Sequence, residues 1–254
     1  MPQSTQTDRK VAIVTGAGRG IGAACARALA ERGFTVALMS PSDRSIRLAE
    51  TLGGYGRQGS VLSREDLSAL VSDVMARYGR IDAVVNNMGH GGGLPEEVPT
   101  LGYDADFEGS VLDIPDEVWH ESLDMYVLSV AAMARLVTPI MIDQGGGSIV
   151  NISSPNAIEP RQMYPMSALR GALHSFTKLY ADRYARHNVR MNNLLPGFCE
   201  NVALSERAIR DIPMARPAAF GEIASVCAFL ASAEASYLTG QNILVDGGVN
   251  RAVR

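Results

Sequence analysis

The chain has few cysteines and no excess of basic charge, and each shortage excludes a class of protein. Its three cysteines, Cys25, Cys199 and Cys227, are odd in number and widely spaced, with no Cys-x-x-Cys pair and no histidines at metal-ligand spacing. The sequence therefore predicts neither a disulfide framework nor a metal site, and it fits a reducing compartment. A formal net charge of -4 leaves no basic footprint for a nucleic-acid partner.

The chain also lacks a secretory signal and a long apolar run. Its first ten residues, MPQSTQTDRK, are polar. No run approaches the roughly 18 apolar residues of a membrane span. We therefore expect a cytoplasmic protein with no membrane partner.

Short apolar runs alternate with longer helical patterns along the chain. The predicted strands cover 11–15, 34–39, 81–87, 147–153 and 242–248, and the predicted helices cover 25–32, 67–79, 128–141, 168–187 and 221–231. Runs such as VAIV and AVVN lack polar alternation, as expected of strands that helices cover on both faces. The alternation is typical of βαβ units in a parallel sheet.

These patterns predict a single α/β domain over residues 1–254, built on a doubly wound parallel sheet with a Rossmann fold. One stretch, 89–116, is rich in Gly, Pro and acidic residues and has no periodic pattern. We interpret 90–116 as an extended loop insertion, because a long irregular segment in a compact domain is usually functional or mobile.

A glycine-rich loop follows the first predicted strand. Residues 15–22 read TGAGRGIG and lead into the first helix. Glycines at 16, 20 and 22 allow a tight turn and a close backbone approach to a pyrophosphate, and the N–H groups of the helix N-terminus bind the anion. The loop predicts a dinucleotide site; a glycine-rich turn without a ligand is the alternative.

The end of the second strand indicates which dinucleotide binds. An acid about 20 residues after the glycine loop usually accepts the ribose hydroxyls of NAD. Here the strand ends at Ser40 without a carboxylate, and Asp43 comes late. Arg19 in the loop, with the hydroxyls of Ser40 and Ser42, favours a 2′-phosphate and so NADP(H) over NAD(H). Alternatively, Arg19 is only a solvated charge.

Five motifs stand in a fixed order: TGAGRGIG, NNMG (86–89), VNISS (150–154), RMNNLLPG (190–197) and LTGQNILVDGG (238–248). With them the chain resembles the short-chain dehydrogenase/reductase family from about residue 10 to 249. The glycine loop, the second strand and the resemblance together give the predicted cofactor-binding residues: Gly16, Arg19, Gly20, Ile21, Gly22, Ser40, Asn87, Gly89, Pro196 and Gly197.

The resemblance implies a catalytic Asn, a Ser and a Tyr-x-x-x-Lys pair. In that pair the phenol exchanges a proton with the substrate, and the ammonium lowers the pKa of the phenol and holds the nicotinamide ribose. This chain departs from the pattern. Counting back from the Pro-Gly pair, Met166 stands in place of the tyrosine and Arg170 in place of the lysine, and Tyr126 falls about where the family has the asparagine. Ser154, or its neighbour Ser153, is retained.

The predicted catalytic residues are therefore Ser154, Tyr164 and Arg170. Arg170 keeps the positive charge and can hold the ribose, although a guanidinium does not shuttle protons as an amine does. Tyr164 or Tyr126 would supply the phenol, and Pro165 places Tyr164 in an extended turn before the helix. Alternatively, Tyr164 only packs at the helix entrance.

The sequence thus indicates an NADP(H)-dependent oxidoreductase that reduces a carbonyl or imine of a small metabolite. Two alternatives remain open: a non-catalytic dinucleotide-binding subunit or sensor, and a cofactor-free lyase resembling the halohydrin dehalogenases. The helices predicted at 119–142 and 168–187 resemble those that pair in family oligomers. We therefore expect a homodimer or homotetramer.

Overall fold

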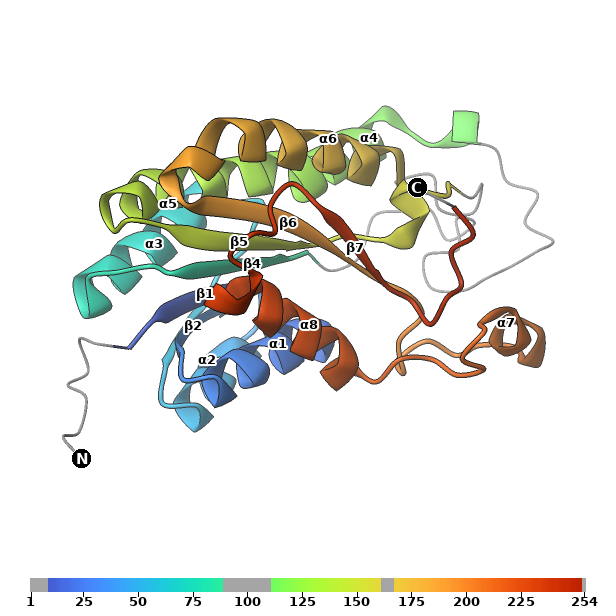
Figure 1. Cartoon of the computed structure of the whole chain (residues 1–254), viewed down its shortest axis with the longest axis horizontal. Coiled ribbons are helices and arrows are strands. Elements are labelled where there is room, and N and C mark those ends of the chain that lie inside the picture. The colour runs from blue at the N-terminus through green and yellow to red at the C-terminus, as the bar shows by residue number, and fades with distance from the viewer. Residues whose placement is uncertain (1–8, 89–110, 161–166, 253–254) are drawn as a thin grey trace.

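The computed structural model describes residues 9–88, 111–160 and 167–252. Within this part of the chain, seven parallel strands form one sheet in the order β3-β2-β1-β4-β5-β6-β7 (Figure 1). The strands are β1 (Val11–Thr15), β2 (Thr35–Ser40), β3 (Tyr55–Gln58), β4 (Ala83–Asn87), β5 (Gly147–Ile152), β6 (Val189–Pro196) and β7 (Asn242–Val245). The predicted doubly wound α/β fold is confirmed.

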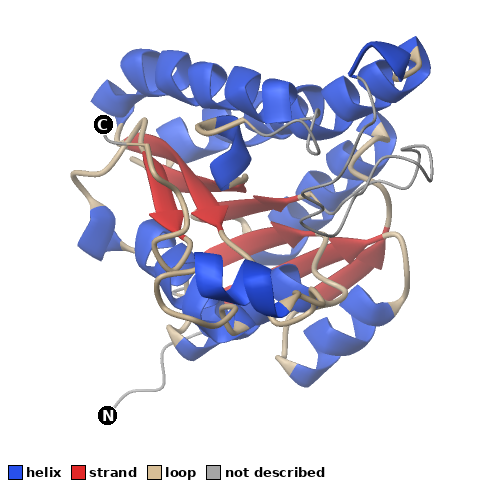
Figure 2. Cartoon of the chain, turned by 90° about the vertical axis from the view of Figure 1, so that its right-hand side faces the viewer, coloured by secondary structure: helices blue, strands red, loops and turns tan. Residues whose placement is uncertain are grey.

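Helices cover both faces of the sheet, with α1, α2 and α8 on one side and α3 to α6 on the other (Figures 1 and 2). The helices are α1 (Gly20–Glu31), α2 (Arg44–Thr51), α3 (Arg64–Tyr78), α4 (Asp116–Leu123), α5 (Ser129–Asp143), α6 (Ser167–Tyr184), α7 (Glu206–Asp211) and α8 (Phe220–Ala231). Shorter turns are η1 (Val111–Asp113), the π-helical η2 (Asp124–Leu128), η3 (Pro155–Ala157), η4 (Ala185–His187) and η5 (Ala233–Ala235).

The central strand β1 shows why its sequence lacks polar alternation. All five of its residues are buried. Val11 and Ile13 pack into the core under α3 and α5, whereas Ala12 and Val14 pack into the core under α1 and α8. Because both faces are covered by helices, every position of the strand buries an apolar side chain.

The helical run from Asp116 to Asp143 joins α4, η2 and α5 and is long and apolar enough to cross a membrane by length and composition. Length and composition alone are weak evidence for a membrane span, because a buried core helix passes the same test. More than half of its most apolar window is buried inside the protein. Met133, Val137 and Met141 lie in the core, so the run is a core helix of the sheet.

The predicted loop insertion at 90–116 falls mainly outside the described residues. Its described end is helical, because η1 covers Val111–Asp113 and α4 begins at Asp116. Pro115 immediately precedes α4 in extended conformation, and two acidic residues occupy the first turn. Both features favour a helix start, and the sequence analysis overlooked them.

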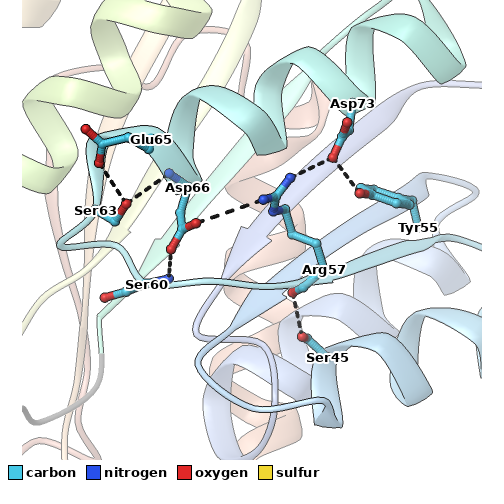
Figure 3. A network of polar contacts seen from close by, with 8 residues as sticks. All are labelled: Ser45, Tyr55, Arg57, Ser60, Ser63, Glu65, Asp66 and Asp73. Atoms are coloured by element: carbon cyan, nitrogen blue, oxygen red, sulfur yellow. Dashed lines mark hydrogen bonds and ion pairs between the residues drawn. The ribbon is translucent and has the colours of Figure 1, made fainter.

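The edge strand β3 is held by charge rather than by apolar packing (Figure 3). Arg57 Nη1 donates to Asp73 Oδ2 on α3 at 2.8 Å, and the Tyr55 hydroxyl donates to the same oxygen at 2.6 Å. The hydrogen bond from Tyr55 lowers the pKa of Asp73 below its ordinary value. This polar anchoring explains why the sequence Tyr-Gly-Arg-Gln gave no strand signal.

Asparagines in register connect the other half of the sheet. Asn86, Asn151, Asn193 and Asn242 lie opposite one another on β4, β5, β6 and β7. Their side-chain amides hydrogen-bond in series, at 2.9, 3.0 and 2.8 Å. We call this series the asparagine ladder. A shift of one residue in any of these strands would break it, so the ladder fixes the register of the four strands.

The ladder predicts a large stability loss for Asn151→Leu. This change removes the acceptor of Asn86 and one donor to Asn193, and both of these asparagines are buried. Unsatisfied buried amides cost about 3 kcal/mol together, and the loss is measurable as a lower free energy of unfolding in urea. The comparison variant Asn242→Val, at the half-buried end of the ladder, removes one acceptor instead of two partners and should lose about half as much, roughly 1.5 kcal/mol. Equal losses in the two variants would contradict this account.

Candidate functional site

The glycine loop lies between β1 and α1 and is pressed against the end of β4. Gly16 and Gly20 have φ of +59° and +56°, in the left-handed region. A Cβ on Gly16 would lie 2.2 Å from the Asn87 carbonyl oxygen, and one on Gly22 would lie 2.3 Å from the Gly16 oxygen. Asn87 Nδ2 donates to the Gly16 carbonyl at 3.0 Å. The loop therefore tolerates only glycine at these two close approaches.

The N-terminus of α1 offers backbone donors at this loop. Arg19 is the N-cap residue in extended conformation, and no side chain among the described residues caps the helix. No acidic residue stands in the first turn, so the backbone N–H groups and the helix dipole favour an anion here. Ile21 packs against the core under α1 and α8 and anchors this turn. The arrangement fits the diphosphate of a dinucleotide.

The tip of β2 borders the same loop. A Cβ on Gly18 would lie 2.9 Å from Ser40 Oγ and 3.3 Å from the Arg44 Cβ. The Ser40 hydroxyl donates to the Ser42 carbonyl at 2.9 Å, so its proton is engaged within the turn. Asp43 pairs with Arg47. The sequence analysis did not include Arg44 among the cofactor-binding residues, although it directly follows the turn.

Pro196 and Gly197 lie at the same edge of the sheet, where β6 ends. Gly197 N donates to the Val245 carbonyl at 3.0 Å, and a Cβ on Gly197 would lie 2.7 Å from Asp246 Cα. The ends of β1, β4, β5 and β6 therefore meet at one edge, as parallel strands require. The strand order reverses between β1 and β4, which is where ligands bind in open parallel sheets.

Ser154 follows β5 at this edge and begins the turn η3. Its Oγ accepts a hydrogen bond from the Asn156 N–H at 3.2 Å. Because a hydroxyl also carries one proton, Ser154 keeps a donor that no described residue engages. Such a donor fits a substrate oxygen on which negative charge develops.

Ser153 has a different partner. It is buried, and its Oγ lies 2.8 Å from Nε2 of His174 on α6. Of the two serines that the sequence left as alternatives, Ser154 is thus the one with an unengaged proton among the described residues. The sequence analysis missed His174, although its place one turn after Arg170 is a usable signal.

A polar stripe of α6 faces β5. Arg170 Nη1 donates to the Ile152 carbonyl at 3.2 Å, His174 contacts Ser153, and Thr177 Oγ1 lies 3.3 Å from Asn151 Nδ2. These residues are spaced at i, i+4 and i+7, which places them on one side of the helix. The stripe holds the start of α6 against the end of β5, and it brings Arg170 to the carbonyl of Ile152, two residues before Ser154.

Arg170 is buried against an aromatic ring. Its guanidinium carbon lies 4.2 Å from the centre of the Tyr126 ring, and the two residues are 7% and 5% exposed. Burial lowers the pKa of Arg170, and the interaction with the adjacent Tyr126 acts in the opposite direction. Among the described residues, no carboxylate pairs with this guanidinium.

The structure thus brings together the glycine loop, Ser154, Arg170 and Tyr126 at one edge of the sheet. Tyr164 and Gly89, also predicted for the site, lie outside the described residues, as does Met166. The described part of the chain contains no group of three His, Cys, Asp or Glu side chains that could hold a metal ion.

Comparison with known proteins agrees with this geometry. A family model described as enoyl-(acyl carrier protein) reductase matches residues 16–250. The chain is 33% identical to dehydrogenase/reductase SDR family member 4 of Bos taurus, over 98% of this chain and 90% of that protein. It is 34% identical to the 3-oxoacyl-[acyl-carrier-protein] reductase FabG of Thermotoga maritima, over 94% of this chain and 97% of that protein.

Two solved structures that share this fold are those of reductases. YwfH, an NADPH-dependent reductase involved in bacilysin biosynthesis, has a TM-score of 0.84 and 26% identity over 97% of this chain and 100% of its own. An actinorhodin polyketide ketoreductase with NADPH has a TM-score of 0.84 and 27% identity, over 98% of this chain and 100% of its own. These similarities do not favour the sensor or lyase alternatives. The chain belongs to the short-chain dehydrogenase/reductase family of oxidoreductases.

Proposed function

We propose that the protein is an NADP(H)-dependent reductase that acts on a carbonyl or imine of a small metabolite. The observation that carries the proposal is the glycine loop pressed against Asn87 at the uncapped N-terminus of α1, a cradle shaped for a diphosphate. When bound, the nicotinamide supplies the hydride. The described residues around it supply orientation and charge.

The preference for a 2′-phosphate rests on the β2 tip. No carboxylate stands at Ser40, where a ribose hydroxyl of NAD would need an acceptor. Arg19 is exposed in the loop, and Arg44 starts α2 beside Gly18. Neither arginine forms an ion pair with a described residue, so both remain available to a phosphate. The two structural relatives named above also use or bind NADPH.

At the reacting end, Ser154 donates its free proton to the substrate oxygen or nitrogen, and Arg170 holds the nicotinamide ribose. An iminium substrate arrives positively charged, so hydride addition creates no anion and needs no acid. A ketone does need an acid, because its oxygen gains negative charge. The sequence-based assignment of that role to Tyr164 stays a prediction.

A homodimer or homotetramer and a cytoplasmic location also stay predictions. Leu179 on α6 is an exposed apolar side chain on one of the two helices expected at the subunit contact. Light scattering of the purified protein measures the oligomeric state directly.

The proposed function is tested by two measurements in sequence. Titration of the protein with NADPH and with NADH, followed by nucleotide fluorescence, gives both dissociation constants. A panel containing acetoin, cyclohexanone, ethyl acetoacetate and 1-pyrroline is then screened for loss of NADPH absorbance. We expect tight NADPH binding and turnover of at least one compound. Tight binding without turnover would support the sensor alternative, and absence of binding would refute the proposal.

The Arg19→Ala variant is expected to weaken NADPH binding selectively. A charge-assisted hydrogen bond to phosphate contributes roughly 1.5–3 kcal/mol, so the Kd for NADPH should rise about 10- to 100-fold. The Kd for NADH should change less than about twofold, because NADH has no 2′-phosphate. Arg27→Ala, exposed two turns further along α1, removes the same charge and serves as control. Equal losses of affinity for NADPH and NADH would show that Arg19 does not bind the 2′-phosphate.

Substitution of the two adjacent serines should separate a catalytic from a structural role. Ser154→Ala removes the free donor and should lower kcat/KM about 100-fold with unchanged NADPH affinity. Ser153→Ala removes the contact with His174 and should lower stability by about 1 kcal/mol while most activity remains. Steady-state kinetics and thermal melting measure both effects. The reverse pattern would reassign the catalytic serine to position 153.

A further inference from the structure

The site as described lacks one component that reduction of a ketone requires. When the carbonyl carbon receives a hydride, the oxygen must take up a proton. Met166, at the family's tyrosine position, carries no exchangeable proton. A group near Arg170 and Ser154 that carries an unengaged proton would supply this component. The search for it rests on the proposed reductase function.

Tyr126 reaches the site through an irregular turn. It lies in η2, the π-helical turn that joins α4 to α5, and such turns recur at functional sites. Ser129, three residues later, lies 3.6 Å from the Met88 sulfur through its Oγ. Met88 directly follows Asn87, which holds the glycine loop. The turn therefore lies against the strand end that borders the cofactor cradle.

Arg170 connects Tyr126 to the substrate-binding serine. The guanidinium donates to the carbonyl of Ile152, two residues before Ser154, and its carbon lies 4.2 Å from the centre of the Tyr126 ring. One buried side chain thus fixes the distance between the end of β5 and the phenol. Both partners are almost fully buried, so the phenol lies in a protected environment.

The guanidinium of Arg170 offers no acceptor to the phenol beside it. It carries only N–H donors, so the hydroxyl proton of Tyr126 cannot form a hydrogen bond to it. The proton therefore remains for another acceptor. Within the described ranges, no residue accepts it.

We propose that Tyr126, held by Arg170, is the proton donor of the reductase and takes the place of the tyrosine that Met166 replaces. As the carbonyl carbon gains the hydride with its electron pair, the C=O π electrons move to oxygen. The oxygen forms a bond to the Tyr126 proton, and the phenolate remains beside the guanidinium until water returns a proton. The sum is ketone plus NADPH plus H⁺ giving alcohol plus NADP⁺. Arg170 is a positioning residue that stabilises the phenolate charge.

The decisive variant is Tyr126→Phe, which keeps the ring against the guanidinium and removes only the hydroxyl. We expect the melting temperature to stay within a few degrees of the wild type. The Kd for NADPH should change less than about twofold. The kcat/KM for the best ketone of the panel should fall about 100- to 1,000-fold. Tyr237→Phe, which removes the hydroxyl of a fully exposed tyrosine, serves as the control and should retain the wild-type rate.

A substrate that needs no proton separates catalysis from packing. Hydride addition to N-methyl-1-pyrrolinium gives a neutral amine directly, so the Tyr126→Phe variant should reduce this cation as fast as the wild type does. A structural role of Tyr126 would slow the ketone and the cation alike, and that result would overturn the proposal. A loss of ketone reduction in Tyr164→Phe instead of Tyr126→Phe would overturn it as well.

A measurement without turnover makes the proposal independent of the substrate panel. The protein labelled with 3-fluorotyrosine should give ¹⁹F resonances for its eight tyrosines, and the one missing in Tyr126→Phe belongs to Tyr126. We expect saturating NADPH to shift this resonance and to leave that of Tyr180 unmoved, since Tyr180 is buried against Thr138 and Tyr184. NADPH binding without a shift at Tyr126 would overturn the assignment of Tyr126 as proton donor and leave the proposed reductase function standing. Failure of NADPH to bind would refute the reductase function and this inference with it.

Discussion

The contact between Gly16 and Asn87 is the constraint on which the site depends. Any side chain at Gly16 would overlap the Asn87 carbonyl, and the Asn87 amide holds the Gly16 oxygen from the other side. Gly16 directly follows β1 and Asn87 ends β4, and the strand order reverses between these two neighbours. Because the loop cannot move away from β4, the N–H groups of α1 point to a fixed position. Phosphate binding is thus prepared by packing before any ligand arrives.

A second constraint is the burial of a cation that no acid among the described residues neutralises. Moving a guanidinium out of water is costly, and the lowered pKa of Arg170 reflects this. The protein offsets the cost with the Ile152 carbonyl and with the face of the Tyr126 ring. A planar guanidinium can donate and stack at once, whereas a lysine ammonium has no flat face to stack. Arginine at this position therefore fits an aromatic partner better than the family's lysine would.

Much of the fold and of the candidate site could be predicted from the sequence. The features that the sequence did not predict were missed for physical reasons. Central strands such as β1 and β4 are apolar at every position, so their patterns are unambiguous. The edge strand β3 is held by Arg57 and Asp73 and carries no apolar pattern. The position of Arg170 follows from counting back along a regular helix and strand from Pro196. The stacking of Tyr126 on it does not, because spacing in sequence does not reveal a π-helical turn.

That turn changes the interpretation of the altered catalytic motif. Loss of Tyr-x-x-x-Lys on one helix suggests lost chemistry only if the acid and the cation must share that helix. In the proposed reaction the reacting atoms would lie at the edge where β4, β5, η2 and α6 meet, and each of these elements can contribute a side chain. A phenol from η2 and a cation from α6 satisfy the same chemical requirement as two residues of α6. What the reaction requires is a proton beside a buried positive charge, and the scaffold offers more than one way to place it.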